Sequence, residues 1–244
     1  MEKIRIQKAI ADAGYCSRRK AEEFIEKGRV SVNGHPAQIG MKVGIKDLIA
    51  IDKVPLERSR RKDHLYIMMN KPRGYISTMS DEQGRRCVAD LLTGVPQRVF
   101  PIGRLDVNSE GLLLFTSDGD FANDLMHPSR HVTKTYRVTV RPDVSDEQAV
   151  QLAEGVVIDG RKTSPAEIRV LTKEAGRVVM EVIIREGRNR QVRKMCEAVG
   201  LEVARLKRIA EGPIRLGMLK PGTIRELKKE ELKAIRTAIT KPTK

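Results

Sequence analysis

Residues 103–119 read GRLDVNSEGLLLFTSDG and form the most informative segment of the chain. Gly111 to Thr116 is a short apolar run bounded by turn-forming residues, which is typical of a buried β-strand. Val99 to Ile102 predicts a second strand before it. The polar loop between them presents Arg104 and Asp106 from rigid supports, a common way to hold a catalytic group. An aspartate in such a loop is more often a turn or cap residue, so the loop alone leaves both interpretations open.

Short strands mixed with a few helices surround this loop. We expect strands at residues 65–69, 135–140, 168–171 and 178–184, and helices at 121–126, 145–153 and 191–199. Strands with alternating faces and irregular helix insertions favour an α+β domain over a doubly wound parallel one. Residues 63–244 are therefore predicted to form a domain built on a mixed, largely antiparallel sheet with flanking helices.

The first 62 residues follow another pattern and predict a small α/β domain. Residues 4–13 carry apolar side chains at helical spacing. Ser17 is placed to cap a second helix, and Gly28 is placed to end it. Strands are expected at residues 29–32 and 48–51, with Asn33-Gly34 as a hairpin turn.

The charge of the chain calls for a polyanionic, membrane or acidic partner. It has 47 Lys and Arg against 32 Asp and Glu, a formal charge of +15. Residues 1–62 hold 15 basic and 8 acidic residues, a net of +7. A solvated helix face explains most charge runs, but acidic partners are few here and nucleic acid is favoured. The candidate contacts in this region are Arg5, Lys8, Arg18, Arg19, Lys20 and Arg29.

Other classes of function lack support in the sequence. There is no run of 18 apolar residues and no apolar N-terminal stretch, so we expect a cytoplasmic protein without membrane contact. His127 and His131 are four residues apart, but Pro128 between them makes a shared helix face doubtful, and no metal site is predicted. No glycine-rich nucleotide motif occurs, so we expect no nucleotide cofactor. Three widely spaced cysteines fit free thiols in a reducing compartment.

Residues 5–34, RIQKAIADAGYCSRRKAEEFIEKGRVSVNG, resemble the small RNA-binding module called the S-four-type domain. The resemblance covers roughly residues 2 to 62 and implies RNA binding without implying a reaction. Arg58 to Lys62 lacks apolar periodicity and is predicted to be an exposed basic linker, which places the domain boundary there. The two expected domains are therefore residues 1–62 and 63–244.

The segment from residue 103 closely resembles the catalytic loop of the pseudouridine synthases, in the branch that contains the small-subunit enzyme RsuA and the large-subunit enzyme RluB. Three further segments match that family in order: NKPRG at 70–74, KTYRV at 134–138 and GRNRQVRKM at 187–195. The resemblance spans roughly residues 2 to 235. It implies an enzyme that converts uridine in ribosomal RNA to pseudouridine, with no cofactor.

The resemblance also implies roles for individual residues. Asp106 is the catalytic carboxylate, Arg193 its partner cation, and Tyr136 packs against the target base. Arg104 is the side chain that fills the space left when the uridine leaves its stack. The remaining expected RNA contacts are Lys134, Arg188, Arg190 and Lys194.

Several alternatives stay open at this point. A noncatalytic ribosome-assembly factor would need only the basic N-terminal module, and a metal-dependent nuclease could use Asp118 and Asp120, although a turn and helix cap explain that pair better. The KTYRV form, the length and the basic extension after Gly222 favour large-subunit over small-subunit RNA. That extension, with Lys228, Lys229, Lys233, Arg236, Lys241 and Lys244, either enlarges the RNA-binding surface or is a solubilising helix with a frayed end, and the second interpretation is slightly favoured. A monomer is expected.

Overall fold

The computed structural model describes residues 3–58 and 63–240. Residues 59–62 of the predicted basic linker, and Lys241 and Lys244 of the predicted tail, lie outside the described residues. The chain divides into two compact units. One comprises residues 1–65 with 96–98 and 117–119, and the other holds the remaining residues.

The first unit packs two helices against small antiparallel sheets. The helices are α1 (Ile6–Asp12) and α2 (Arg18–Glu26). Its strands are β1 (Ile4–Arg5), β2 (Val30–Val32), β3 (His35–Pro36), β4 (Lys42–Val43), β5 (Ile49–Ile51) and β6 (Val54–Pro55). The order β3-β2-β5-β6 forms one sheet and β1-β4 another. Both helices bury their apolar faces in one core that includes Ile6, Ile10, Ile25 and Ile49.

The local signals of this unit are largely confirmed. The Ser17 hydroxyl accepts a hydrogen bond from the backbone N–H of Lys20 at 3.1 Å, as expected for a helix cap. Asn33 and Gly34 have φ of 51° and 84°, which suits the tight hairpin between β2 and β3. The helix expected from residue 4 begins at Ile6 instead, because Ile4 and Arg5 pair with Val43 and Lys42.

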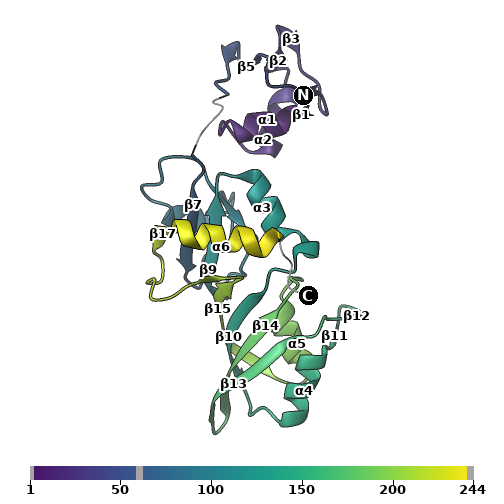
Figure 1. The fold of residues 1–244 in the computed structure, drawn as a ribbon, viewed down its shortest axis with the longest axis vertical. Helices are drawn as coiled ribbons and strands as arrows, with labels where there is room; N and C mark the ends of the chain where they lie inside the picture. Colours follow the sequence, from purple (N-terminus) through teal and green to yellow (C-terminus); the bar gives the residue numbers. More distant parts are fainter. Residues whose placement is uncertain (1–2, 59–62, 241–244) are drawn as a thin grey trace. The chain divides into compact units, whose positions relative to one another are not determined.

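The second unit is built on a mixed, largely antiparallel sheet, which confirms the predicted α+β class (Figure 1). Its strand order is β13-β14-β10-β15-β9-β7-β17, with β8 and β16 attached to β9 and β15. These strands are β7 (Tyr66–Lys71), β8 (Phe100–Ile102), β9 (Glu110–Thr116), β10 (Lys134–Arg141), β13 (Glu167–Glu174), β14 (Arg177–Ile184), β15 (Glu202–Glu211), β16 (Ile214–Arg215) and β17 (Ile224–Glu226). Only the β15–β9 contact is parallel among the pairs of this sheet in the described residues.

The helices cover the two halves of this sheet separately. In Figure 1, α3 (Gly119–Met126) and α6 (Lys229–Thr240) lie by the β7–β9 half, whereas α4 (Asp146–Glu154) and α5 (Gln191–Ala198) lie by the β10–β14 half. The short hairpin of β11 (Val157–Ile158) and β12 (Arg161–Lys162) lies next to α5. Two 3₁₀ helices, η1 (Val88–Leu91) and η2 (Pro128–Arg130), complete the elements.

The C-terminal helix α6 belongs to the core of this unit. Ile235 is 0% exposed and Ile239 is 5% exposed, and both pack with Met68, Leu112 and Leu114 of the sheet. The predicted helix exists, but the view of it as a solubilising extension was wrong. The charged residues of α6 lie on its exposed side, and the opposite, apolar side of the helix packs against the sheet.

Candidate active site

The loop that carries Asp106 connects two paired strands. Strand β8 runs antiparallel to β9, with Ile102 opposite Leu114 and Phe100 opposite Thr116. Within the loop, the backbone N–H of Ser109 donates to the carbonyl of Asp106 at 3.0 Å, which closes a turn directly after the aspartate. Asp106 is therefore held at a fixed position at the end of a rigid hairpin.

The buried side chain of Lys71 fixes the backbone of this loop. Its ammonium donates to the carbonyl oxygens of Asp106 at 3.1 Å, Ser109 at 2.8 Å and Pro72 at 3.2 Å. The side chain has 0% exposure, and burial lowers the pKa of Lys71 to about 8, while the negative charges of Asp106 and Glu110 act in the opposite direction. An ammonium offers three donors, so all three N–H groups have a carbonyl partner.

Two further contacts hold the same loop. The Ser77 hydroxyl donates to the carbonyl of Leu105 at 2.7 Å and accepts from the N–H of Leu105 at 3.1 Å. The N–H of Gly74 donates to the carbonyl of Val107 at 2.7 Å. The segment 74–77, which follows β7, thus lies along the loop of Asp106 and binds its backbone.

Arg193 holds the loop from the other side. It lies on α5 with 8% exposure, and its guanidinium donates to the carbonyls of Asn108 at 3.0 Å and Val203 at 3.2 Å. Burial lowers the pKa of Arg193, and the Asp106 carboxylate opposes this effect. An arginine stays charged at this position, so Asp106 has a fixed cation in its surroundings.

Tyr136 lies on β10 among buried charged residues. It stands opposite Arg208 of β15, and Lys134 stands opposite Glu211. Desolvation raises the pKa of the Tyr136 hydroxyl, and the Arg208 guanidinium acts to lower it. Burial also lowers the pKa of Lys134, with Glu211 acting against it.

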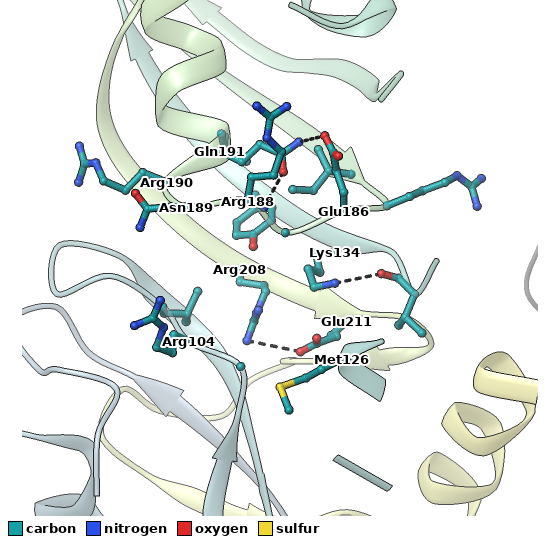
Figure 2. Close-up of a pocket in the computed structure, with 18 of the residues that line it drawn as sticks. Arg104, Met126, Lys134, Glu186, Arg188, Asn189, Arg190, Gln191, Arg208 and Glu211 are labelled. Carbon is teal, nitrogen blue, oxygen red and sulfur yellow. Dashed lines mark hydrogen bonds and ion pairs between the residues drawn. The ribbon is translucent and has the colours of Figure 1, made fainter. Parts of the chain in front are cut away.

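The Asp106 loop and the Tyr136 strand border one cavity of about 740 Å³. Asp106 and Tyr136 line it together with Arg104, Lys134, Arg188 and Arg190. Figure 2 shows Arg104 on one side of this space and Arg188, Asn189 and Arg190 on the other. Such a volume is ample for a single nucleoside. Arg193 and Lys194 contact neighbouring backbone and side chains instead of lining the cavity.

The predicted phosphate-binding residues of this unit fall into two groups. Arg188 donates to the carbonyls of Ile158 and Arg161, and Lys194 forms an ion pair with Asp159 at 2.7 Å. Arg188 therefore connects the β11–β12 hairpin to the loop before α5, and Lys194 connects the hairpin to α5 itself. Arg104 and Arg190 are exposed, and within residues 3–58 and 63–240 neither side chain has a hydrogen-bond or ion-pair partner.

The predicted RNA-binding residues of the first unit are exposed or half-buried, and three of them have carboxylate partners. Lys8 pairs with Asp12 at 2.8 Å, Lys20 with Glu23 at 2.7 Å, and Arg29 with Asp52. Arg29 also lies 4.3 Å from the centre of the Phe24 ring. Arg5, Arg18 and Arg19 are exposed on the surface. Exposed ion pairs contribute only about 0–1 kcal/mol, so these cations can exchange their partners for phosphates.

In the described part of the chain, no group of three or more His, Cys, Asp or Glu side chains is arranged to hold a metal ion. No helix formed by residues 3–58 and 63–240 is long and apolar enough to cross a membrane.

Three residues of this site were not predicted from the sequence. Lys71 lies in a segment that carried the family resemblance but had no predicted role, and no strand was predicted over β15, which carries Arg208 and Glu211. The signal for Lys71 is a lone lysine ending the apolar run YIMMNK. Arg208 and Glu211 had no local signal, because a charged residue in a basic stretch is ordinarily exposed.

Comparisons with known proteins agree with this geometry. The model of the RNA pseudouridylate synthase family matches residues 65–198, and that of the S4 domain matches residues 4–49. The chain is 43% identical to "Ribosomal large subunit pseudouridine synthase B" of Bacillus subtilis over 95% of each chain. It is 37% identical to the protein of the same name from Pseudomonas aeruginosa, over 93% of this chain and 60% of that protein.

A solved structure supports the same assignment. The structure titled "Crystal structure of pseudouridylate synthase" is 28% identical, with a TM-score of 0.69, over 95% of this chain and 99% of that one. The predicted family and the predicted RNA-binding module are thereby confirmed. The chain belongs to the RNA pseudouridylate synthase family and carries an S4 domain in its N-terminal part.

Proposed function

We propose that this enzyme isomerises a specific uridine of large-subunit ribosomal RNA, and that it acts in the cytoplasm as a monomer without a cofactor. Two relatives named for the large ribosomal subunit support this choice of RNA, and one of them matches over 95% of its length. The formal charge of +15 supports a polyanionic substrate. The first 62 residues hold the RNA, and residues 63–244 perform the reaction.

Asp106 is the catalytic carboxylate in this proposal. The reaction breaks the bond between N1 of uracil and the ribose and forms a bond from C5 to the same sugar carbon. C5 loses a proton, N1 gains one, and no atom enters or leaves the nucleotide overall. Asp106 begins this sequence by attacking the sugar or by removing a ribose proton, and both routes need an ionised carboxylate beside the sugar.

The remaining roles follow from where the side chains lie. Tyr136 packs against the target base in the cavity, and Arg193 is the partner cation of Asp106 and binds the backbone of its loop. Arg104 fills the space left by the flipped uridine. Arg190 contacts the RNA backbone as an exposed cation, joined by Lys134, Arg188 and Lys194 where they exchange protein partners for phosphates.

The observation that carries the proposal is the fixation of the Asp106 loop at the cavity. Lys71 binds its backbone at Asp106 and Ser109, and Arg193 binds it at Asn108. Because the backbone around Asp106 is bound on both sides, the carboxylate keeps its position while the base turns. A reaction with two successive bond changes at one sugar requires such a fixed group.

Tritium release from transcripts labelled at C5 of uracil tests the proposal. Large-subunit and small-subunit transcripts are incubated with enzyme, with and without chelator. We expect release from the large-subunit transcript only, at the same rate in chelator. Release from the small-subunit transcript alone would reject the choice of RNA, and loss of release in chelator would reject a cofactor-free reaction. Light scattering of the purified chain tests the monomer.

A further inference from the structure

The floor of the cavity contains a buried pair of opposite charges that the roles above do not use. Arg208 and Glu211 are 2% and 3% exposed, and both line the cavity. Their Nη2 and Oε2 atoms are 3.4 Å apart, and Figure 2 shows the two side chains joined beside Lys134. Burying such a pair carries a desolvation penalty that its attraction often fails to offset, so stability alone is a weak reason for it.

The backbone fixes Arg208 between the two catalytic segments. Its Nε donates to the carbonyl of Leu112 at 2.7 Å, on the strand that leaves the Asp106 loop. On its other side, Arg208 stands opposite Tyr136 in the β10–β15 ladder. Gly111 allows this close approach, because a Cβ there would lie 2.2 Å from the carbonyl oxygen of Arg208. Arg208 thus connects the strand of the catalytic aspartate to the strand of the tyrosine.

The hydrogen-bonding capacity of the pair is incompletely used. Among the described residues, Nη2 of Arg208 and Oε2 of Glu211 have no hydrogen-bond partner, although both atoms are buried. A guanidinium that keeps a donor unused next to a phenol can direct that donor to the phenol oxygen. The charged groups that act on the Tyr136 hydroxyl are the Arg208 guanidinium, which lowers its pKa, and the carboxylates of Glu211 and Asp106, which raise it.

We propose that Arg208, held in place by Glu211, is a positioning residue that fixes the Tyr136 hydroxyl at the target base and influences the reaction through this hydroxyl. The inference rests on the proposed role of Tyr136 in the same cavity. Lys71 and Arg193 act on the loop of Asp106, whereas this pair lies next to Tyr136 in the sheet. Arg208 therefore changes the rate of the chemical step and leaves RNA affinity unchanged.

A double-mutant cycle tests this dependence. Arg208→Lys is measured alone and combined with Tyr136→Phe, under single-turnover conditions with saturating enzyme. Misplacing a catalytic group by about 1 Å can slow a reaction roughly 100-fold, so we expect Arg208→Lys to slow the wild-type background by about 10- to 100-fold. In the Tyr136→Phe background, which has no hydroxyl to position, we expect less than about twofold further slowing. The dissociation constant for RNA should change by less than about twofold.

Controls separate this inference from folding defects and from the proposed function. Arg177→Lys makes the same substitution at an exposed site on β14 and should leave the rate unchanged. Glu211→Gln keeps the volume of the side chain, and it should slow the reaction only when the Tyr136 hydroxyl is present. This variant tests the inference if Arg208→Lys does not fold. Equal slowing in both backgrounds would overturn the inference, and so would a fully active Tyr136→Phe. In either case the wild type would still release tritium, so the proposed function would not be affected.

Discussion

Replacing Lys71 with methionine isolates the contribution of the buried ammonium to the catalytic loop. Methionine keeps most of the apolar stem and removes the three donors to the carbonyls of Pro72, Asp106 and Ser109. Hydrogen bonds to charged groups contribute about 1.5–3 kcal/mol each, so three give roughly 4–9 kcal/mol. Removing the buried charge recovers several kcal/mol of desolvation free energy. The free energy of unfolding should fall by about 2–4 kcal/mol.

The effect on the reaction should exceed the effect on stability. With the ammonium gone, the loop loses its anchor below Asp106, and a shift of about 1 Å in the carboxylate corresponds to a roughly 100-fold slower chemical step. Urea unfolding measures stability, single-turnover tritium release measures the rate, and hydrogen exchange at residues 103–109 measures the mobility of the loop. Lys220→Met, at an exposed lysine, is the matched control.

The outcome that refutes this reasoning is specific. If folded Lys71→Met protein releases tritium at the wild-type rate, with unchanged exchange in the loop, the ammonium does not position Asp106. A loss of stability without a loss of rate would assign Lys71 to folding alone.

Three further predictions concern charge, pH and packing. RNA affinity should fall by about 10³- to 10⁵-fold between 50 and 200 mM salt if roughly 6 to 10 phosphates are contacted, and Arg190→Gln should reduce the salt slope by about one, as measured by filter binding. The pKa of Lys71 is about 8 in the folded protein against 10.5 ordinarily, so the folded state binds fewer protons between these values. Its contribution to stability therefore rises from pH 8 to 10.5, and urea unfolding of the wild type should show this gain relative to Lys71→Met. Gly111→Ala should lower the melting temperature far more than Gly176→Ala, because both glycines have positive φ but only Gly111 has backbone within 3 Å of the new Cβ.

The sequence predicted the elements whose signals are local. Three such signals need only a few residues of sequence: the Ser17 helix cap, the turn at Asn33-Gly34 and the apolar strand after Asp106. All three elements occur in the structure. The proposed catalytic residues were accessible through motif resemblance. Loop chemistry alone could not have chosen Asp106, because an aspartate in a turn is common.

The missed features depend on contacts that are distant along the chain. Strand β15 reads EVARLKRIAE, which looks solvent-exposed, yet it lies inside the sheet between β10 and β9. Arg208 is buried there because the carbonyl of Leu112, 96 residues away in sequence, accepts its Nε–H. Likewise, Lys71 is bound by carbonyls 35 and 38 residues further along the chain. The hydrophobic periodicity of a sequence does not predict such polar contacts.

The most direct test of the account is tritium release from the large-subunit transcript by three proteins: the wild type, Asp106→Asn and Asp118→Asn. The first substitution removes the proposed catalytic carboxylate and keeps its shape, and the second changes a nearby aspartate that has no role in the proposal. We predict that Asp106→Asn binds the transcript but releases no tritium, while the other two proteins release it at similar rates. Release by Asp106→Asn at the wild-type rate would contradict the central claim.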